Sequence, residues 1–126
     1  MEKTKEVVEK IKKLGKDKVK FIILYGSQSN NKQTPMSDTD IAVYYDADKE
    51  QRFKFRMKIL GRVNDKYDIQ IFQDLPLYIK KDVIKGKITY NSDKRLIHDI
   101  SRKTYQEFDD FKKRFYDYIK KGVISW

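Results

Sequence analysis

The pattern of hydrophobic and polar positions along the chain predicts four helices and four strands. Apolar residues recur at helical steps of three and four in four segments, 5–14, 49–60, 76–86 and about 92–120. Runs that are continuously apolar, or that alternate with polar residues, predict strands at 19–25, 39–45, 67–72 and 87–90. The resulting order, α-β-β-α-β-α-β-α, predicts a single domain over residues 1–126 of the α/β (α+β) class, with a small mixed sheet flanked by helices.

Two of these helices carry specific expectations about their faces. In the helix 49–60 we expect Phe53, Met57 and Leu60 to face the core. The long last helix carries a stripe formed by Ile97, Ile100, Thr104, Phe108, Phe111, Phe115 and Tyr118. A helix of this length overhangs a domain of this size, so two readings stay open for its second half: packing on the domain's own sheet, or contact with a partner.

Three carboxylates stand out on the predicted strands. Asp38 and Asp40 are separated by one residue at the start of the second strand, so their side chains project to the same side of an extended chain. Asp68 lies within the apolar third strand, where an acid is costly unless it is paired or binds a metal. If these two strands are neighbours, the three carboxylates form one cluster whose oxygen atoms suit Mg²⁺ or Mn²⁺. Such a cluster can hold two metal ions for in-line attack on a phosphorus atom.

The end of the first strand supplies a candidate phosphate site. Gly26 permits a sharp turn and a close approach of the backbone to a phosphate, and a short helix beginning at Ser27 would point free N–H groups at it. A Gly-Ser turn, an Asp-x-Asp pair and a strand acid are each common and structurally explicable alone. Their order on these particular strands favours a metal-dependent phosphoryl-transfer site.

The composition predicts a folded and highly charged protein. Of its 126 residues, 39% are hydrophobic and 38% charged, and the formal net charge is +10. Basic and acidic residues are interleaved almost everywhere, which is more typical of a solvated surface than of a polynucleotide groove. Nucleic acid is therefore the less favoured partner.

Several kinds of site and location are disfavoured. The chain has no cysteine, which excludes disulfides and thiolate metal sites, and its single histidine, His98, is expected to be structural. The charged N-terminal stretch is unlike a signal peptide, and no apolar run approaches the length that crosses a bilayer. We therefore expect a soluble, cytoplasmic protein with no membrane partner.

The site motif resembles that of a known family. Gly-Ser at 26–27, ten intervening residues, Asp-Thr-Asp at 38–40 and Asp68 on a following strand resemble the minimal nucleotidyltransferase (MNT, MntA-type antitoxin) group of the DNA polymerase β-like superfamily. The resemblance covers nearly the whole chain, including the helix that begins at Pro76 and the long last helix. It implies the polymerase β-like nucleotidyltransferase fold.

The resemblance also implies roles for the residues that match the motif. Asp38 and Asp40 would bind both of two Mg²⁺ ions (or Mn²⁺), Asp68 would bind the catalytic one, and Gly26 and Ser27 would hold the triphosphate of ATP. These three acids would be the catalytic residues as well as the metal ligands.

Members of this group are commonly antitoxins whose partner is a HEPN-domain ribonuclease toxin. The resemblance implies transfer of AMP from ATP to a tyrosine of that toxin, although the sequence itself shows no acceptor. One alternative is an antitoxin that neutralises its partner by docking alone, and the intact carboxylates argue against it. Another is a nucleotidyltransferase for RNA or a small molecule; RNA-modifying relatives generally carry extra domains that 126 residues do not accommodate.

Overall fold

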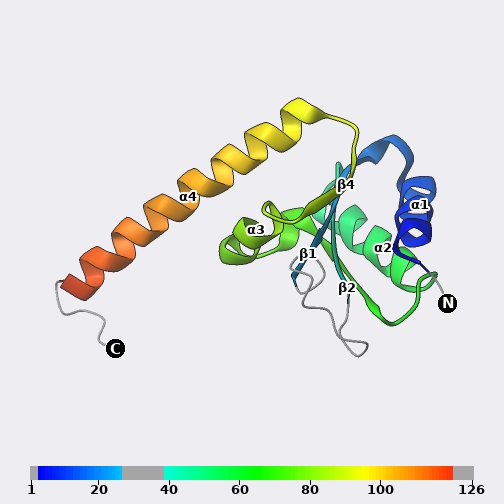
Figure 1. Ribbon diagram of the computed structural model, residues 1–126, viewed down its shortest axis with the longest axis horizontal. Coiled ribbons are helices and arrows are strands. Elements are labelled where there is room, and N and C mark those ends of the chain that lie inside the picture. Colours follow the sequence, from blue (N-terminus) through cyan, green and yellow to red (C-terminus); the bar gives the residue numbers. More distant parts are fainter. Residues whose placement is uncertain (1–2, 27–38, 121–126) are drawn as a thin grey trace.

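The computed structural model describes residues 3–26 and 39–120, and its helices and strands follow the predicted order (Figure 1). The elements are α1 (Thr4–Gly15), β1 (Val19–Tyr25), β2 (Thr39–Tyr45), α2 (Lys49–Leu60), β3 (Tyr67–Ile71), α3 (Leu77–Val83), β4 (Lys87–Asn91) and α4 (Lys94–Lys120), with short 3₁₀ turns η1 (Lys16–Lys18) and η3 (Phe72–Asp74). The fold class predicted from the sequence is confirmed, including the long last helix. The third strand ends one residue earlier than predicted, because the chain turns into η3 at Phe72.

The sheet is mixed, with the strand order β3-β2-β1-β4. β1 pairs antiparallel with both β2 and β4, whereas β2 and β3 run parallel. A parallel pair needs a crossover between its strands, and α2 provides it. In consequence the C-terminal end of β1 and the N-terminal ends of β2 and β3 share one edge of the molecule.

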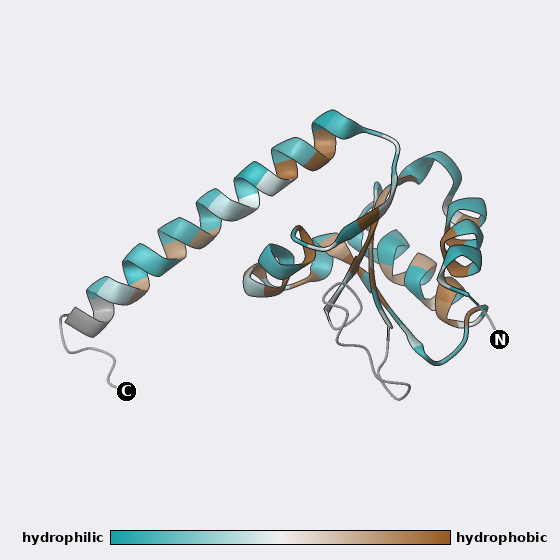
Figure 2. Cartoon of the chain, viewed as in Figure 1, coloured by the Kyte–Doolittle hydropathy of each residue, from teal (hydrophilic) through white to brown (hydrophobic). Residues whose placement is uncertain are grey.

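The sheet separates two apolar layers. On one face, α1 and α2 pack on residues of β1, β2 and β3, and the side chains buried there include Val7, Ile11, Val19, Ile22, Ile41, Val43, Phe55, Ile59, Ile69 and Ile71. On the other face, α3 and the first part of α4 cover Phe21, Ile23, Ala42, Phe72 and Val83. Figure 2 shows hydrophobic positions on the sides of α1 and of the first part of α4 that face the sheet.

The prediction of which α2 residues face the core is wrong for two of the three residues. Phe53 and Met57 are 59% and 41% exposed, while Phe55 and Ile59 are the buried residues of this helix. Leu60 is partly buried and packs against the core, as expected.

Two arginines explain why the sequence pattern misled. Arg52 and Arg56 lie on the same side of α2 as its buried residues, and their polar ends reach past the core. The Arg52 guanidinium binds the Asp74 carboxylate through two nitrogens, at 2.8 and 3.3 Å. Arg56 Nε donates to the Ile69 carbonyl of β3 at 2.7 Å. The buried side of the helix therefore does not read as apolar.

The first half of α4 packs within the domain. Ile97 and Ile100 contact the second apolar layer, and Thr104 is buried, with its hydroxyl donating to the Ile100 carbonyl at 2.8 Å. At the next turn the Lys81 ammonium of α3 lies 4.0 Å from the centre of the Phe108 ring. Packing of this half on its own domain is thus confirmed. The side chain of Tyr118 lies outside the described residues. None of the described helices is both long and apolar enough to span a membrane.

We expect two phenylalanines on α2 to respond oppositely to truncation. Phe55→Ala removes a buried ring that stacks on Tyr45 with centroids 3.9 Å apart, and should lower the free energy of unfolding by about 3–5 kcal/mol. Phe53→Ala should change it by less than about 0.5 kcal/mol, because that ring is exposed. Urea unfolding of both variants measures the difference, and equal losses would contradict the orientation of α2.

Candidate active site

Two of the predicted acids lie side by side on neighbouring strands. Asp40 of β2 is the direct register partner of Asp68 of β3. Because the strands are parallel and in register, both carboxylates project from the same face of the sheet. The next residue of β2, Ile41, belongs to the first apolar layer, so Asp40 faces the α3 side. The prediction that these two strands are neighbours is confirmed.

Gly26, at the end of β1, lies against the Asp40 carboxylate. Tyr25, the last residue of β1, is the register partner of Asp40, and Gly26 follows with a φ of +73°. A Cβ added to Gly26 would come within 2.5 Å of Asp40 Oδ2. Only glycine combines this left-handed backbone with so close an approach to the carboxylate. The predicted turn residue is therefore packed directly against one of the predicted acids.

The cluster is a locus of negative charge. The pKa of the Tyr25 phenol rises to about 12, chiefly because the ring is partly buried and further because Asp40 and Asp68 lie nearby. Gln70 Nε2 donates to Asp68 Oδ1 at 3.1 Å, which orients that carboxylate. Sequence reasoning missed both Tyr25 and Gln70. The available signal was alternation, since Gln70 is two residues beyond Asp68 on the same strand and therefore on the same face.

Two predicted site residues, Ser27 and Asp38, lie outside the described residues. Their roles therefore stay predictions. Within residues 3–26 and 39–120, no group of three histidine, cysteine or acidic side chains is placed to hold a metal ion. The structure brings together Gly26, Asp40 and Asp68, and the third carboxylate of the predicted cluster is Asp38.

The side chains that are described fit a hard divalent cation. Asp40 and Asp68 present only carboxylate oxygens, the ligands that Mg²⁺ and Mn²⁺ prefer. Two such groups in register repel each other, and a cation between them removes that repulsion. A metal ion here would be held by Asp40 and Asp68, with Asp38 as the predicted third ligand.

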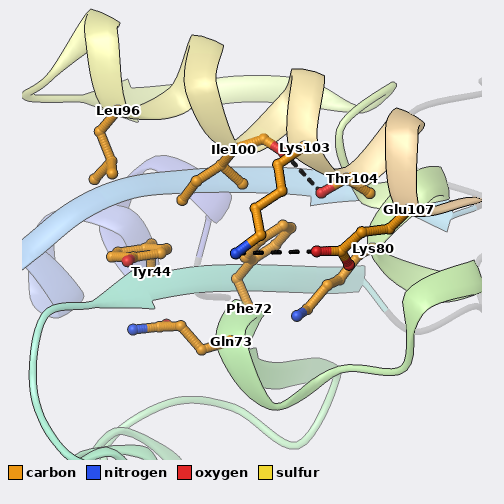
Figure 3. Close-up of a pocket in the computed structure, with 9 residues that line it drawn as sticks. All are labelled: Tyr44, Phe72, Gln73, Lys80, Leu96, Ile100, Lys103, Thr104 and Glu107. Carbon is orange, nitrogen blue, oxygen red and sulfur yellow. Dashed lines mark hydrogen bonds and ion pairs between the residues drawn. The ribbon is translucent and has the colours of Figure 1, made fainter.

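The cavity under α4 lies apart from these acids. It encloses about 260 Å³ between α4, η3 and β2, and its walls are Tyr44, Phe72, Gln73, Lys80, Leu96, Ile100, Lys103, Thr104 and Glu107 (Figure 3). Tyr44 lies four residues beyond Asp40 on β2, a separation of roughly 13 Å along a strand. The cavity is thus at the other end of the strand from the carboxylate pair and is not part of that site.

Comparison with known proteins finds a family model whose match spans the residues of this site. The family model described as "Polymerase beta, Nucleotidyltransferase" matches residues 8–95, which include every residue of the carboxylate cluster. A Methanocaldococcus jannaschii protein, provisionally named a protein adenylyltransferase, is 45% identical over 69 residues. That match covers 55% of this chain and 52% of the relative, so the chain spans about half the length of the curated protein it matches.

Solved structures share the fold at low sequence identity. A "toxin-antitoxin with AMP-PNP" structure has a chain that is 19% identical, with a TM-score of 0.74 over 97% of this chain and 100% of that one. A structure of the tri-AMPylated Shewanella oneidensis HEPN toxin in complex with MNT antitoxin gives 20% identity and a TM-score of 0.66, over 95% and 98% of the two chains. At such identities the likeness establishes the fold alone.

The glycine at the site is open to a direct test. Gly26→Ala should lower the free energy of unfolding by about 1–2 kcal/mol or more, since alanine is strained at this positive φ and its Cβ would displace the Asp40 carboxylate. The matched control is Gly61→Ala, whose nearest described neighbours would be 3.7 Å away and which should be tolerated. Thermal unfolding compares the two, and a Gly26→Ala variant as stable as the control would contradict the close approach.

Proposed function

Because the chain belongs to the polymerase β nucleotidyltransferase family, we propose that it is a Mg²⁺-dependent enzyme that transfers AMP from ATP to a tyrosine hydroxyl of a cognate HEPN-type toxin. It would act as the antitoxin of that pair. The observation that carries the proposal is the in-register pair of Asp40 and Asp68, packed beside Gly26 within the segment that the family model matches.

The chain's own residues would hold the reactants in line. Asp40 and Asp68, together with Asp38, provide the oxygen ligands, and the backbone at Gly26 and Ser27 receives the triphosphate. Mg²⁺ held by these carboxylates would supply positive charge that neutralises the triphosphate and lowers the pKa of the acceptor hydroxyl. Gln70 orients the Asp68 carboxylate through the 3.1 Å hydrogen bond.

The proposed step breaks a phosphoanhydride bond of ATP and forms a phosphate ester bond to the acceptor. The acceptor oxygen forms a bond to the α-phosphorus of ATP, while the bond from that phosphorus to the bridging oxygen of the β-phosphate breaks. Pyrophosphate leaves with the electron pair, and the hydroxyl proton passes to solvent. The product is an AMP-tyrosine phosphodiester, which masks the acceptor side chain.

The partner and substrate are supported by relatives. The M. jannaschii relative is provisionally named a protein adenylyltransferase, and a chain of the same fold is seen with an AMPylated HEPN toxin. A second chain of this fold belongs to a toxin-antitoxin structure with AMP-PNP, an ATP analogue. Docking without chemistry, and transfer to RNA or a small molecule, are the outcomes that an assay must separate from this proposal.

The assay is incubation of the chain with labelled ATP, Mg²⁺ and the product of the neighbouring gene, tested as the candidate HEPN-type acceptor. We expect label on the HEPN protein, and a loss of about 100-fold or more in Asp40→Asn and in Asp68→Asn, because each variant removes a ligand charge. Asp17→Asn is the control, since Asp17 is an exposed acid in η1, beside the opposite end of β1. A stable complex that never gains mass would favour docking alone, and labelled RNA would redirect the search for the acceptor.

Metal dependence has its own readout. Mg²⁺ should raise the thermal unfolding midpoint of the wild-type chain, because it binds the folded state and relieves the repulsion between Asp40 and Asp68. Asp40→Asn should be at least as stable as wild type without metal and should gain less from Mg²⁺. Excess EDTA should abolish transfer, and full activity in EDTA would refute the two-metal mechanism.

A further inference from the structure

The second half of α4 presents aromatic side chains beyond the domain. Figure 1 shows the helix passing α3 and continuing clear of the sheet. Phe108, Phe111 and Phe115 follow one another along this half, and we call them the distal face. The centroids of successive rings are 6.4 and 6.1 Å apart. Phe111 is 49% exposed, and within the described part of the chain its ring contacts are with the other two phenylalanines.

The distal face is held at a defined position relative to the sheet. Ile97, Ile100 and Thr104 fix the first half of the same helix in the second apolar layer. Lys81 of α3, 4.0 Å from the centre of the Phe108 ring, is placed where the helix leaves the domain. Phe111 is exposed, and Phe108 and Phe115 are partly buried. Because the helix that carries them is anchored at one end, the stripe is ordered before a partner binds.

The shape of the distal face suits another helix. Its rings recur at steps of three and four, which form a straight narrow stripe along a helix. The cavity under α4 adjoins this stripe, because its wall residue Thr104 lies one helical turn before Phe108 on the same side of the helix. Grooves and stripes of this kind receive the apolar ridge of an amphipathic helix.

The charges beside the stripe select the sign of that partner. Lys112 and Arg114 lie on its two flanks by helical geometry, and the Lys112 ammonium is 5.7 Å from the centre of the Phe108 ring. Glu107 lies on the same flank as Arg114, and its carboxylate is 3.9 Å from the Lys103 ammonium. Helical geometry places Asp109 and Asp110 on the other side of the helix. A helix that docks here would therefore bring acidic side chains to the edges of its apolar ridge.

A second copy of this chain fits the distal face poorly. Two copies paired in antiparallel orientation about Phe111 would bring the two Lys112 side chains close together, which is repulsive. Two copies paired in parallel would place the second α4 along the side of the first α4 where α3 and the sheet already pack (Figure 1).

We propose that the distal face is the docking surface for the acceptor protein, which binds through an amphipathic helix whose apolar ridge is bordered by acidic residues. The proposal rests on the proposed transfer of AMP to a HEPN-type protein, and adds where and by what chemistry that protein is held. The transferring site and the docking surface are separate parts of one chain, so each can be altered without the other.

The test measures docking without chemistry. Binding of the candidate acceptor protein from the transfer assay is measured by titration calorimetry without nucleotide, in an Asp40→Asn background. Phe111→Glu should weaken binding by about ten-fold or more, because it places a charge in the apolar contact. Phe53→Glu is the matched control and should bind as the parent does, because Phe53 is also exposed (59%, against 49% for Phe111) and lies on α2, across the sheet. Circular dichroism and the unfolding midpoint confirm that both variants are folded.

The basic residues beside the stripe are tested separately. Lys112→Glu combined with Arg114→Glu should weaken binding at low salt, with the difference shrinking as salt rises. A Phe111→Glu variant that binds like its parent would overturn the proposal. So would a wild-type chain that sediments as a dimer which Phe111→Glu dissociates, since the occupant would then be a second copy.

The two proposals fail in different ways. At saturating acceptor, Phe111→Glu with Asp40 intact should transfer AMP at a near-normal kcat with a raised KM, whereas Asp68→Asn should dock normally and transfer nothing. Docking that depends on Phe111 with no transfer by the wild-type chain would refute the chemistry and keep the surface. Transfer with docking indifferent to Phe111 would refute the surface and keep the chemistry.

Discussion

The parallel pairing of β2 with β3 is the constraint on which the rest of the structure depends. It sets Asp40 and Asp68 next to each other on one sheet face, where two carboxylates repel unless a cation lies between them. Burial, and after it the charge of these two acids, raises the pKa of the neighbouring Tyr25 phenol. A cation bound between the carboxylates, as we propose, would remove their repulsion.

The surrounding elements hold this pair in place. The crossover helix α2 makes the parallel pairing possible, and Arg56 ties it to β3 through the Ile69 carbonyl. Gly26 lets the end of β1 come against the Asp40 carboxylate without a side chain in the way. With both faces of the sheet covered, the carboxylate pair sits on a rigid platform, and the chemistry we propose depends on the positions of atoms more than on motion.

The two halves of the long last helix have different surroundings. Its first half completes the core on the α3 side, so it cannot move independently of the sheet that carries the acids. Its second half carries Phe111 out to solvent. A protein acceptor held there would be positioned relative to the carboxylates by a single continuous helix, which converts binding energy into orientation of the reacting hydroxyl.

The sequence by itself determined the helices and strands, their order, and two acids, Asp40 and Asp68, that the structure places side by side. These follow from local rules, since the period of hydrophobicity and the spacing of Asp38, Asp40 and Asp68 can be read along the chain. Membership of the family followed from the same motif. Only the tertiary structure decided that Asp40 and Asp68 are in register, that Phe55 rather than Phe53 is buried, and where α4 leaves the core. The physical reason is that register, helix orientation and burial depend on neighbours distant in the sequence. Arg52 and Arg56 illustrate this, because their hydrogen-bond partners lie on other elements, and no local pattern reveals that a charged side chain covers a buried face.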